Sequence, residues 1–218
     1  MPLTRNRFTR CLSLAAAAAG LFYSACAGAG DQQYIRLAAS VRTVLAQSIS
    51  DQAAPRLVFD NELQGQAWLA EMSRRLTPMM PDSAQRADFL TSVQYEATRA
   101  GLDPQMVLGV IEVESRFRKY AVSRAGARGY MQVMPFWVAQ IGARSQNLFH
   151  LRTNLRYGCT ILRFYLDMEK GDLYRALERY NGSLGNTTYP DRVRRAWEKH
   201  WSLPPAMTVL NAGAPGKR

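Results

Sequence analysis

The sequence of 218 residues contains only two histidines and three cysteines. This scarcity excludes a His-rich metal site, an H-E-x-x-H metalloprotease and a cysteine-cluster zinc module, so we predict neither a metal nor a cofactor. Acids are also scarce, since 17 Asp and Glu stand against 28 Lys and Arg, which gives a formal net charge of +11. The positive excess favours an anionic partner, which could be nucleic acid, a membrane surface or an acidic polymer.

A signal peptide is predicted at the start of the chain. No acid occurs before Asp31, and Arg5, Arg7 and Arg10 precede an apolar stretch over residues 12–23. Small residues over 25–29 offer cleavage sites, so residues 1–29 are predicted to be a cleaved signal that sends the protein to the periplasm.

Two alternatives to cleavage stay open. The uncharged run over residues 11–30 just reaches the length of about 20 residues that spans a bilayer, although Ala and Gly dominate it. Lipidation at Cys26 would instead make the protein a membrane-anchored lipoprotein. We therefore expect membrane association only if Cys26 is lipidated or the signal is uncleaved.

Export would restrict both the pairing of the cysteines and the class of partner. Cleavage would leave Cys159 as the only cysteine, so the mature chain would have no internal disulfide. Cys159 continues the helical spacing of Leu155 and Leu162, which predicts a core residue. An exported protein meets cell wall or anionic lipid more than nucleic acid, so we expect no nucleic-acid partner.

The mature chain is predicted to be mainly α. Apolar spacing indicates two helices within residues 31–80, separated by a loop near Ala54 and Pro55. Beyond them, N-caps and glycines predict helices that start at Asp82-Ser83, Asp103-Pro104, Leu151, Asp172 and Asp191, and that end near Gly101, Ser115, Lys170, Asn181 and Trp201. The stretch around Gly126, Gly129 and Pro135 is predicted to be a loop.

Glu114 is the candidate catalytic residue. It ends a strongly apolar helical segment, where burial and the negative end of the helix dipole both disfavour a charged carboxylate. Both effects raise the pKa, which suits a general acid near neutral pH. Glu112 lies about 200° away around the helix, so we predict that it faces solvent or forms a salt bridge.

A second carboxylate is missing from the segment that follows Glu114. Two-carboxylate glycosidases place a partner acid within about 5–10 Å of the first. From Ser115 to Leu166 the sequence has no acid and nine basic residues, at positions 116, 118, 119, 124, 128, 144, 152, 156 and 163. If Glu114 is catalytic, we therefore expect it to work as the only carboxylate, and the basic run to attract an acidic polymer.

A string of motifs after Glu114 resembles the soluble lytic transglycosylases of the lysozyme-like superfamily. It comprises Glu114-Ser115-x-Phe117, Ala121-x-Ser123, Gly126-Ala127-x-Gly129-x-Met131-Gln132-x-Met134-Pro135 and the later Tyr180-Asn181-Gly182. The resemblance spans about residues 100–200. It implies a lysozyme-like fold of the goose type, with a catalytic domain at 83–203. Outside that domain, the apolar spacing predicts a helical N-terminal extension at 30–82, and Pro204-Pro205 predicts a flexible tail at 204–218.

The resemblance also implies an activity, which is cleavage of peptidoglycan between N-acetylmuramic acid and N-acetylglucosamine without water. In this family one glutamate acts first as acid and then as base, and leaves a 1,6-anhydro ring; Glu114 takes that role. The tyrosine hydroxyl that approaches the acid is assigned to Tyr180. The expected substrate-binding residues are Ser123, Met131, Gln132, Met134, Tyr180 and Asn181.

The sequence departs from the family pattern at Arg179, which replaces a small residue, and after Asn181, where the usual Ala-Gly pair is absent. Tyr189, before the last helix, stands where the family often places an aromatic residue. Two alternatives stay open: a lysozyme-like muramidase that uses water, and a non-catalytic peptidoglycan-binding or secretion-scaffold protein. Peptidoglycan strands are the expected partner, with a cell-envelope or secretion complex as a further one.

Overall fold

A computed structural model of the protein describes residues 32–50 and 53–203, so the predicted signal and tail lie outside the described residues. Within these ranges the chain is mainly helical, as the sequence predicts. Its only extended pairings there are two isolated bridges, which join Val122 to Arg128 and Arg128 to Val133. The helices are α1 (Ala39–Ser50), α2 (Glu62–Leu76), α3 (Ser83–Arg99), α4 (Pro104–Ser115), α5 (Pro135–Ile141), α6 (Leu151–Met168), α7 (Leu173–Asn181), α8 (Thr188–Ala196) and the π-helical turn η1 (Trp197–Trp201).

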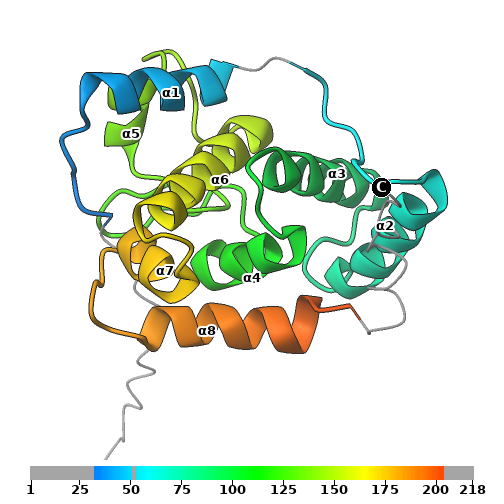
Figure 1. The fold of residues 1–218 in the computed structure, drawn as a ribbon. Coiled ribbons are helices and arrows are strands. Elements are labelled where there is room, and N and C mark those ends of the chain that lie inside the picture. Colours follow the sequence, from blue (N-terminus) through cyan, green and yellow to red (C-terminus); the bar gives the residue numbers. More distant parts are fainter. Residues whose placement is uncertain (1–31, 51–52, 204–218) are drawn as a thin grey trace, which may run out of the picture.

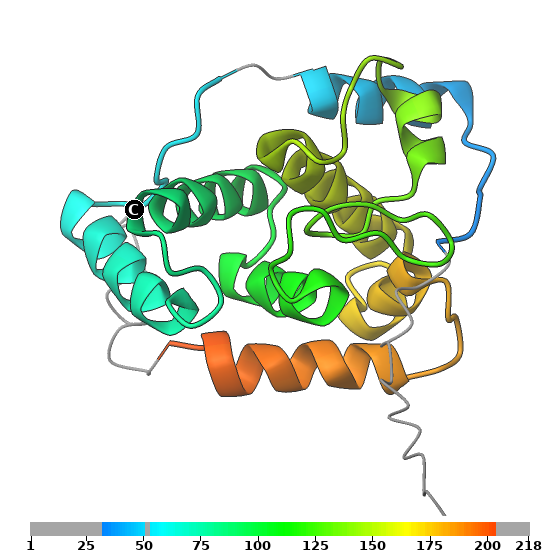
Figure 2. The ribbon, with the colours of Figure 1, turned by 180° about the vertical axis from the view of Figure 1, so that it is seen from behind.

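Helix α4 lies at the centre of the molecule (Figures 1 and 2). It packs against α3 on one side and against α8 and η1 along its length. Every residue from Met106 to Ile111 is buried, which confirms the expectation from its apolar sequence. The last turn of α4, which carries Glu114, is therefore held by neighbours from both halves of the chain.

Three aspartates begin helices as predicted. The side chain of Asp82 accepts a hydrogen bond from Gln85 N, and Asp103 accepts bonds from Gln105 N and Met106 N. Asp172 caps α7 in the same way. Each cap satisfies backbone N–H groups that the first turn of a helix leaves without partners, and so fixes where the helix begins.

Two predictions about the helices are wrong. Pro135 does not merely punctuate a loop: it is the first residue of α5, a position that tolerates proline because no helical partner exists for its nitrogen. The last helix starts at Thr188 and not at Asp191, which lies in its first turn. The helix then continues through η1 to Trp201, where the sequence predicts its end.

The N-terminal part forms the two predicted helices, α1 and α2, with an irregular segment between them. Helix α1 lies across the top of the molecule beside α5 and α6 (Figure 1). Arg99 of α3 donates a hydrogen bond of 2.7 Å to Ser48 O and so fastens the end of α1. The division of the chain at residue 82 stays a prediction.

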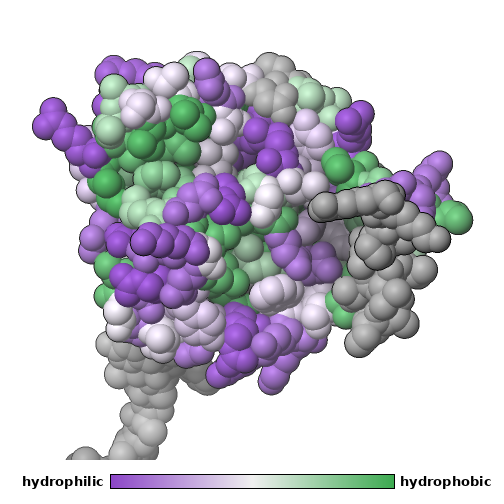
Figure 3. Space-filling model, in the orientation of Figure 1, coloured by the Kyte–Doolittle hydropathy of each residue, from purple (hydrophilic) through white to green (hydrophobic). Residues whose placement is uncertain are grey.

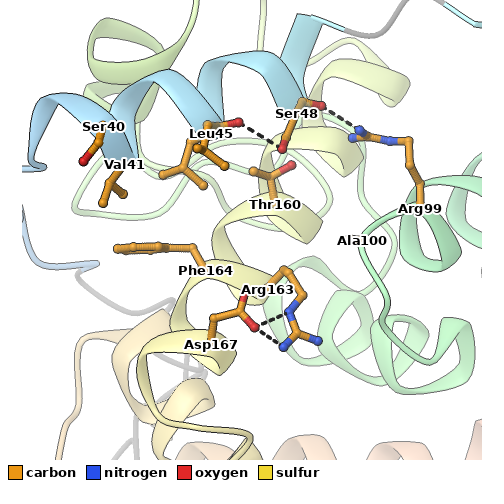
Figure 4. A pocket seen from close by; sticks show the side chains of 11 residues that line it. Ser40, Val41, Leu45, Ser48, Arg99, Ala100, Thr160, Arg163, Phe164 and Asp167 are labelled. Atoms are coloured by element: carbon orange, nitrogen blue, oxygen red, sulfur yellow. Dashed lines mark hydrogen bonds and ion pairs between the residues drawn. The ribbon is translucent and has the colours of Figure 1, made fainter.

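A hollow of about 410 Å³ lies between α1 and α6 (Figure 4). Val41, Val44, Leu45 and Phe164 line it, and hydrophobic side chains gather on this part of the surface below α1 (Figure 3). None of the predicted site residues lines this hollow. In the described ranges, no helix combines the length and the apolar character that crossing a bilayer requires.

Candidate active site

The end of α4 places Glu114 where the chain turns sharply. Arg116 and Phe117 follow it with φ angles of +51° and +61°, a left-handed conformation that non-glycine residues rarely adopt. Such residues cost about 1–3 kcal/mol each and gather at functional sites. The hydroxyl of Ser115 donates to Ile111 O at 3.2 Å, so this side chain bonds to its own helix.

Glu114 is a partly buried carboxylate with one hydrogen-bonding tyrosine. The hydroxyl of Tyr189 donates a bond of 2.6 Å to its Oε1 atom. Burial raises the pKa of Glu114 to about 7, against the smaller lowering effects of the Tyr189 hydrogen bond and the positive charge of Arg192. Near neutral pH this group can therefore both give and take a proton.

Close packing between α4 and α8 brings Tyr189 to Glu114. Gly109 faces α8, and a methyl group there would lie 3.1 Å from Trp197 N and 3.2 Å from Val193 O. The absence of a side chain at Gly109 therefore lets the two helices approach closely. Because Tyr189 lies in the first turn of α8, this approach sets the distance between its hydroxyl and the carboxylate.

Glu112 faces away from the site, as predicted. Its Oε2 atom accepts a bond of 2.7 Å from the indole of Trp201, and its Oε1 atom lies 2.9 Å from Nδ1 of His200. The partner of Glu112 is thus the histidine of η1, and the contact is a salt bridge when that imidazole is protonated. This arrangement assigns Glu112 to fastening η1 against α4 and leaves Glu114 as the carboxylate of the site.

Two other acids on neighbouring helices, Glu178 and Asp167, bond to residues other than Glu114. Glu178 of α7 is buried, and its Oε2 atom accepts a bond of 2.8 Å from Gly185 N. Asp167 of α6 pairs with Arg163 of the same helix. The charged side chain that acts on the pKa of Glu114 is Arg192. Glu114 thus has no described carboxylate as a hydrogen-bonded partner.

The segment after α4 forms a tightly bonded loop that contains Ser123 and Gln132. The Ser123 hydroxyl accepts a bond of 3.1 Å from Ala127 N. Gln132 is buried, and its amide donates to Ala121 O and Gly129 O, at 3.1 and 2.9 Å. Both predicted binding residues therefore shape the loop.

Met131 and Met134 lie on the same segment, just before α5. Met131 is fully buried, and its backbone N donates a bond of 2.8 Å to Oδ1 of Asn154. Its side chain packs on Gly158, where a Cβ would come within 2.3 Å of its sulfur. Met134 is partly exposed and directly precedes α5. Of the two methionines, only Met134 presents surface to solvent.

Tyr180 does not hold the acid in the way the sequence led us to expect. Its hydroxyl donates a bond of 2.7 Å to Met131 O, whereas the bond to Glu114 comes from Tyr189. Tyr180 nevertheless lies near the acid, because the charge of Glu114 contributes, after burial, to raising the pKa of its phenol. One signal in the sequence pointed to Tyr189, because the family often has an aromatic residue at this position before the last helix.

Asn181 closes α7 and keeps one polar atom free. Its amide nitrogen donates a bond of 3.1 Å to the Ser183 hydroxyl, while its Oδ1 atom is buried without a hydrogen-bond partner among the described residues. Buried polar atoms are rarely left unpaired, and each such case calls for an explanation. In this structure the oxygen therefore has neither a described partner nor contact with solvent.

Comparison with known proteins matches a defined part of the chain. A family model described as the transglycosylase SLT domain matches residues 91–200, half of the chain. Membrane-bound lytic murein transglycosylase C of Actinobacillus pleuropneumoniae serotype 5b (strain L20) is 51% identical over 47 residues, which cover 22% of this chain and 13% of that protein. The transglycosylase of Enterobacteria phage PRD1 is 33% identical over 111 residues, 48% of this chain and 39% of its own. The chain thus matches less than half the length of each of these two relatives.

Proposed function

The chain belongs to the transglycosylase SLT family, and we propose on this basis that it is a peptidoglycan lytic transglycosylase. Such an enzyme cleaves the β-1,4 bond between N-acetylmuramic acid and N-acetylglucosamine and leaves 1,6-anhydro-muramyl ends. The observation that carries the proposal is the state of Glu114, a partly buried carboxyl with a pKa of about 7 that is bonded to Tyr189. The names of the relatives support it.

In the proposed reaction Glu114 acts twice. Its protonated carboxyl gives a proton to the glycosidic oxygen, and the bond from that oxygen to C1 of the muramyl residue breaks. The carboxylate then accepts the proton of the muramyl 6-hydroxyl, whose oxygen bonds to C1 and closes the anhydro ring. Attack by this tethered hydroxyl gains the high effective concentration of an intramolecular group. No water is consumed.

Two neighbours are proposed to support the change of charge on Glu114. After the first step the group is a carboxylate, and a hydrogen bond to the charged form stabilises it. Tyr189 supplies that bond, and Arg192 supplies a positive charge. Because the bond occupies Oε1, the second oxygen of Glu114 is the one assigned to the substrate. We also propose that Ser123, Met134 and Asn181 contact the substrate.

The charged surface supports attraction to a wall polymer. Of the nine basic residues that follow Glu114, two are paired with acids: Arg156 with Glu96, and Arg163 with Asp167. The other seven form no ion pair with an acid of the described ranges. We propose that they attract the stem-peptide carboxylates of peptidoglycan.

The same proposal places the protein in the cell envelope. The matched relative from Actinobacillus is named as membrane-bound and murein-cleaving, and the predicted signal at residues 1–29 agrees with export. The periplasm, an anchor at Cys26 and a role beside a secretion complex stay predictions.

Digestion of purified sacculi tests the activity. Soluble muropeptides would be reduced with borohydride and weighed by mass spectrometry. We expect products that lack a reducing end and are lighter than hydrolysis products by the mass of one water. Products that gain two hydrogens would identify a muramidase instead. Binding to sacculi without any release would identify a non-catalytic wall-binding protein.

A further inference from the structure

Gln32 is the first described residue, and its buried side chain forms hydrogen bonds. Its side chain is 5% exposed. Its Oε1 atom accepts a bond of 3.0 Å from the indole nitrogen of Trp137 and a longer one of 3.4 Å from Met134 N. Its amide also lies close to the hydroxyl of Tyr180 and acts to lower the pKa of that phenol. A buried amide oxygen with two donors is a built contact, since polar groups are costly to bury without partners.

The neighbours of Gln32 lie in two different segments of the chain beside the proposed site. Met134 and Trp137 lie at the start of α5, and Tyr180 lies in the last turn of α7. The Tyr180 hydroxyl in turn donates to Met131 O. The amide of Gln32 therefore lies between the loop segment before α5 and the end of α7. Tyr180 is close enough to Glu114 for the charge of the carboxylate to raise the pKa of the Tyr180 phenol, which is itself uncharged near neutral pH.

The residues after Gln32 fasten it in place. We call residues 32–38 the N-terminal strap. Within it, the ring of Tyr34 meets Phe136 edge-on at 5.5 Å, and Leu37 is buried in the core. The strap then leads into α1, which lies beside α5 (Figures 1 and 2). The strap and α1 lie outside residues 91–200, so the match to the family covers neither of them.

We propose that Gln32 is a positioning residue of the active site, which holds Tyr180 and the Met131–Met134 segment in place beside Glu114. The inference rests on the proposed function. Without the amide, the indole N–H of Trp137 and the backbone N–H of Met134 lose their shared acceptor. The segment from Met131 to Trp137 can then shift relative to Glu114. Small displacements of groups around reacting atoms can cost up to about 100-fold in rate.

A conservative variant tests the acceptor oxygen itself. Gln32 is 5% exposed, so burial would keep a carboxyl group at this position protonated near neutral pH. Gln32→Glu then keeps an acceptor for Trp137 and adds no charge.

The test compares three variants in the full-length chain. Gln32→Ala removes the whole contact, Gln32→Glu keeps the shape and one acceptor oxygen, and Gln33→Ala is the matched control, because Gln33 is the adjacent, exposed glutamine. Release of anhydro-muropeptides gives kcat and KM across pH, and circular dichroism follows folding. For Gln32→Ala we expect kcat to fall at least about tenfold with a smaller change in KM. Gln33→Ala should stay within about twofold of the wild type.

Gln32→Glu keeps an acceptor oxygen for Trp137, so it should recover most of the kcat that Gln32→Ala loses. A folded Gln32→Ala protein with the kcat of the Gln33→Ala control would overturn the inference. If Gln32→Ala does not fold, Gln32→Leu replaces it, because leucine fills the space without an acceptor, and a wild-type kcat in that variant would overturn the inference equally. Failure of the proposed function shows separately, as absence of anhydro products from the wild type.

Discussion

The hydroxyl of Tyr189 and Oε1 of Glu114 lie 2.6 Å apart, although 75 positions of sequence separate the two residues. This bond joins the end of α4 to the start of α8. It gives the carboxylate a fixed orientation and a partner that stabilises its charged form. Most of the following predictions concern this pair.

Glu114→Gln should abolish turnover while the fold and wall binding persist, because an amide keeps the shape of the group but cannot donate or accept the proton. Muropeptide release from sacculi would be measured beside circular dichroism. Glu112→Gln is the control on the same helix, and its activity should change by less than about threefold, since Glu112 bonds to His200 and Trp201. Turnover by a folded Glu114→Gln protein within tenfold of the wild type would refute the assignment.

Tyr189→Phe should lower kcat by about 10- to 100-fold and shift the alkaline fall of activity to higher pH. Its hydroxyl holds the pKa of Glu114 down, so removal of the hydroxyl raises that pKa further. Tyr174→Phe is the matched control, because Tyr174 also donates to a carboxylate, that of Asp191, at 3.0 Å. If both variants keep the wild-type pH profile, Tyr189 has no part in tuning the acid.

Tyr180→Phe should also lower turnover more than it lowers binding to sacculi. It removes the bond to Met131 O and leaves the ring in the core. Because the Tyr189–Glu114 bond remains, we expect a smaller shift of the pH profile than in Tyr189→Phe. Turnover and a pull-down on sacculi would be compared, and equal losses in both would indicate a general packing defect.

The free energy of unfolding should depend on pH because the pKa of Glu114 differs between the folded and unfolded states. Its pKa is about 7 in the folded protein, above the ordinary value of 4.5, so the folded state binds more protons between these pH values. The free energy of unfolding should therefore fall as pH rises from about 4.5 to 7, by on the order of 1–3 kcal/mol. Glu114→Gln should lose this component. Thermal melts of both proteins at pH 5 and pH 8 would show it, and parallel shifts in the two proteins would contradict it.

Binding to sacculi should weaken as salt rises, because exposed charges are screened over about 10 Å at 0.1 M and about 3 Å at 1 M. Arg124→Gln should reduce binding at low salt more than Arg163→Gln does. Both remove one positive charge, but that of Arg163 is already paired with Asp167. Equal effects of the two variants, or binding that is flat from 0.1 to 1 M salt, would mean that the basic surface does not attract the wall.

Local signals predicted most of the helices. Asp103 and Pro104 fix the start of α4 through a cap and a compatible φ angle, and both act within one turn. The opposite orientations of Glu112 and Glu114 likewise follow from the geometry of a single helix. Pro135 shows the limit of such signals, since proline suits both a loop and the first position of a helix.

The contacts of the site could not be predicted in the same way. Tyr189 reaches Glu114 only because Gly109 lets α8 approach α4, and the sequence around either residue does not record that packing. Gln32 looks like any polar residue near a chain start, yet its partner Trp137 lies 105 positions away. Tertiary packing decides such pairs, so a single sequence leaves them open.

The Tyr189–Glu114 bond also sets an order of events during synthesis. The ribosome makes Glu114 first and then needs 75 further positions before it reaches Tyr189. At about 5–20 residues per second, that interval lasts roughly 4–15 s. Throughout it the nascent chain carries the acidic side chain without its hydrogen-bond donor or the helix that encloses it. The proposed catalytic centre is therefore completed only after the first turn of α8 has been made.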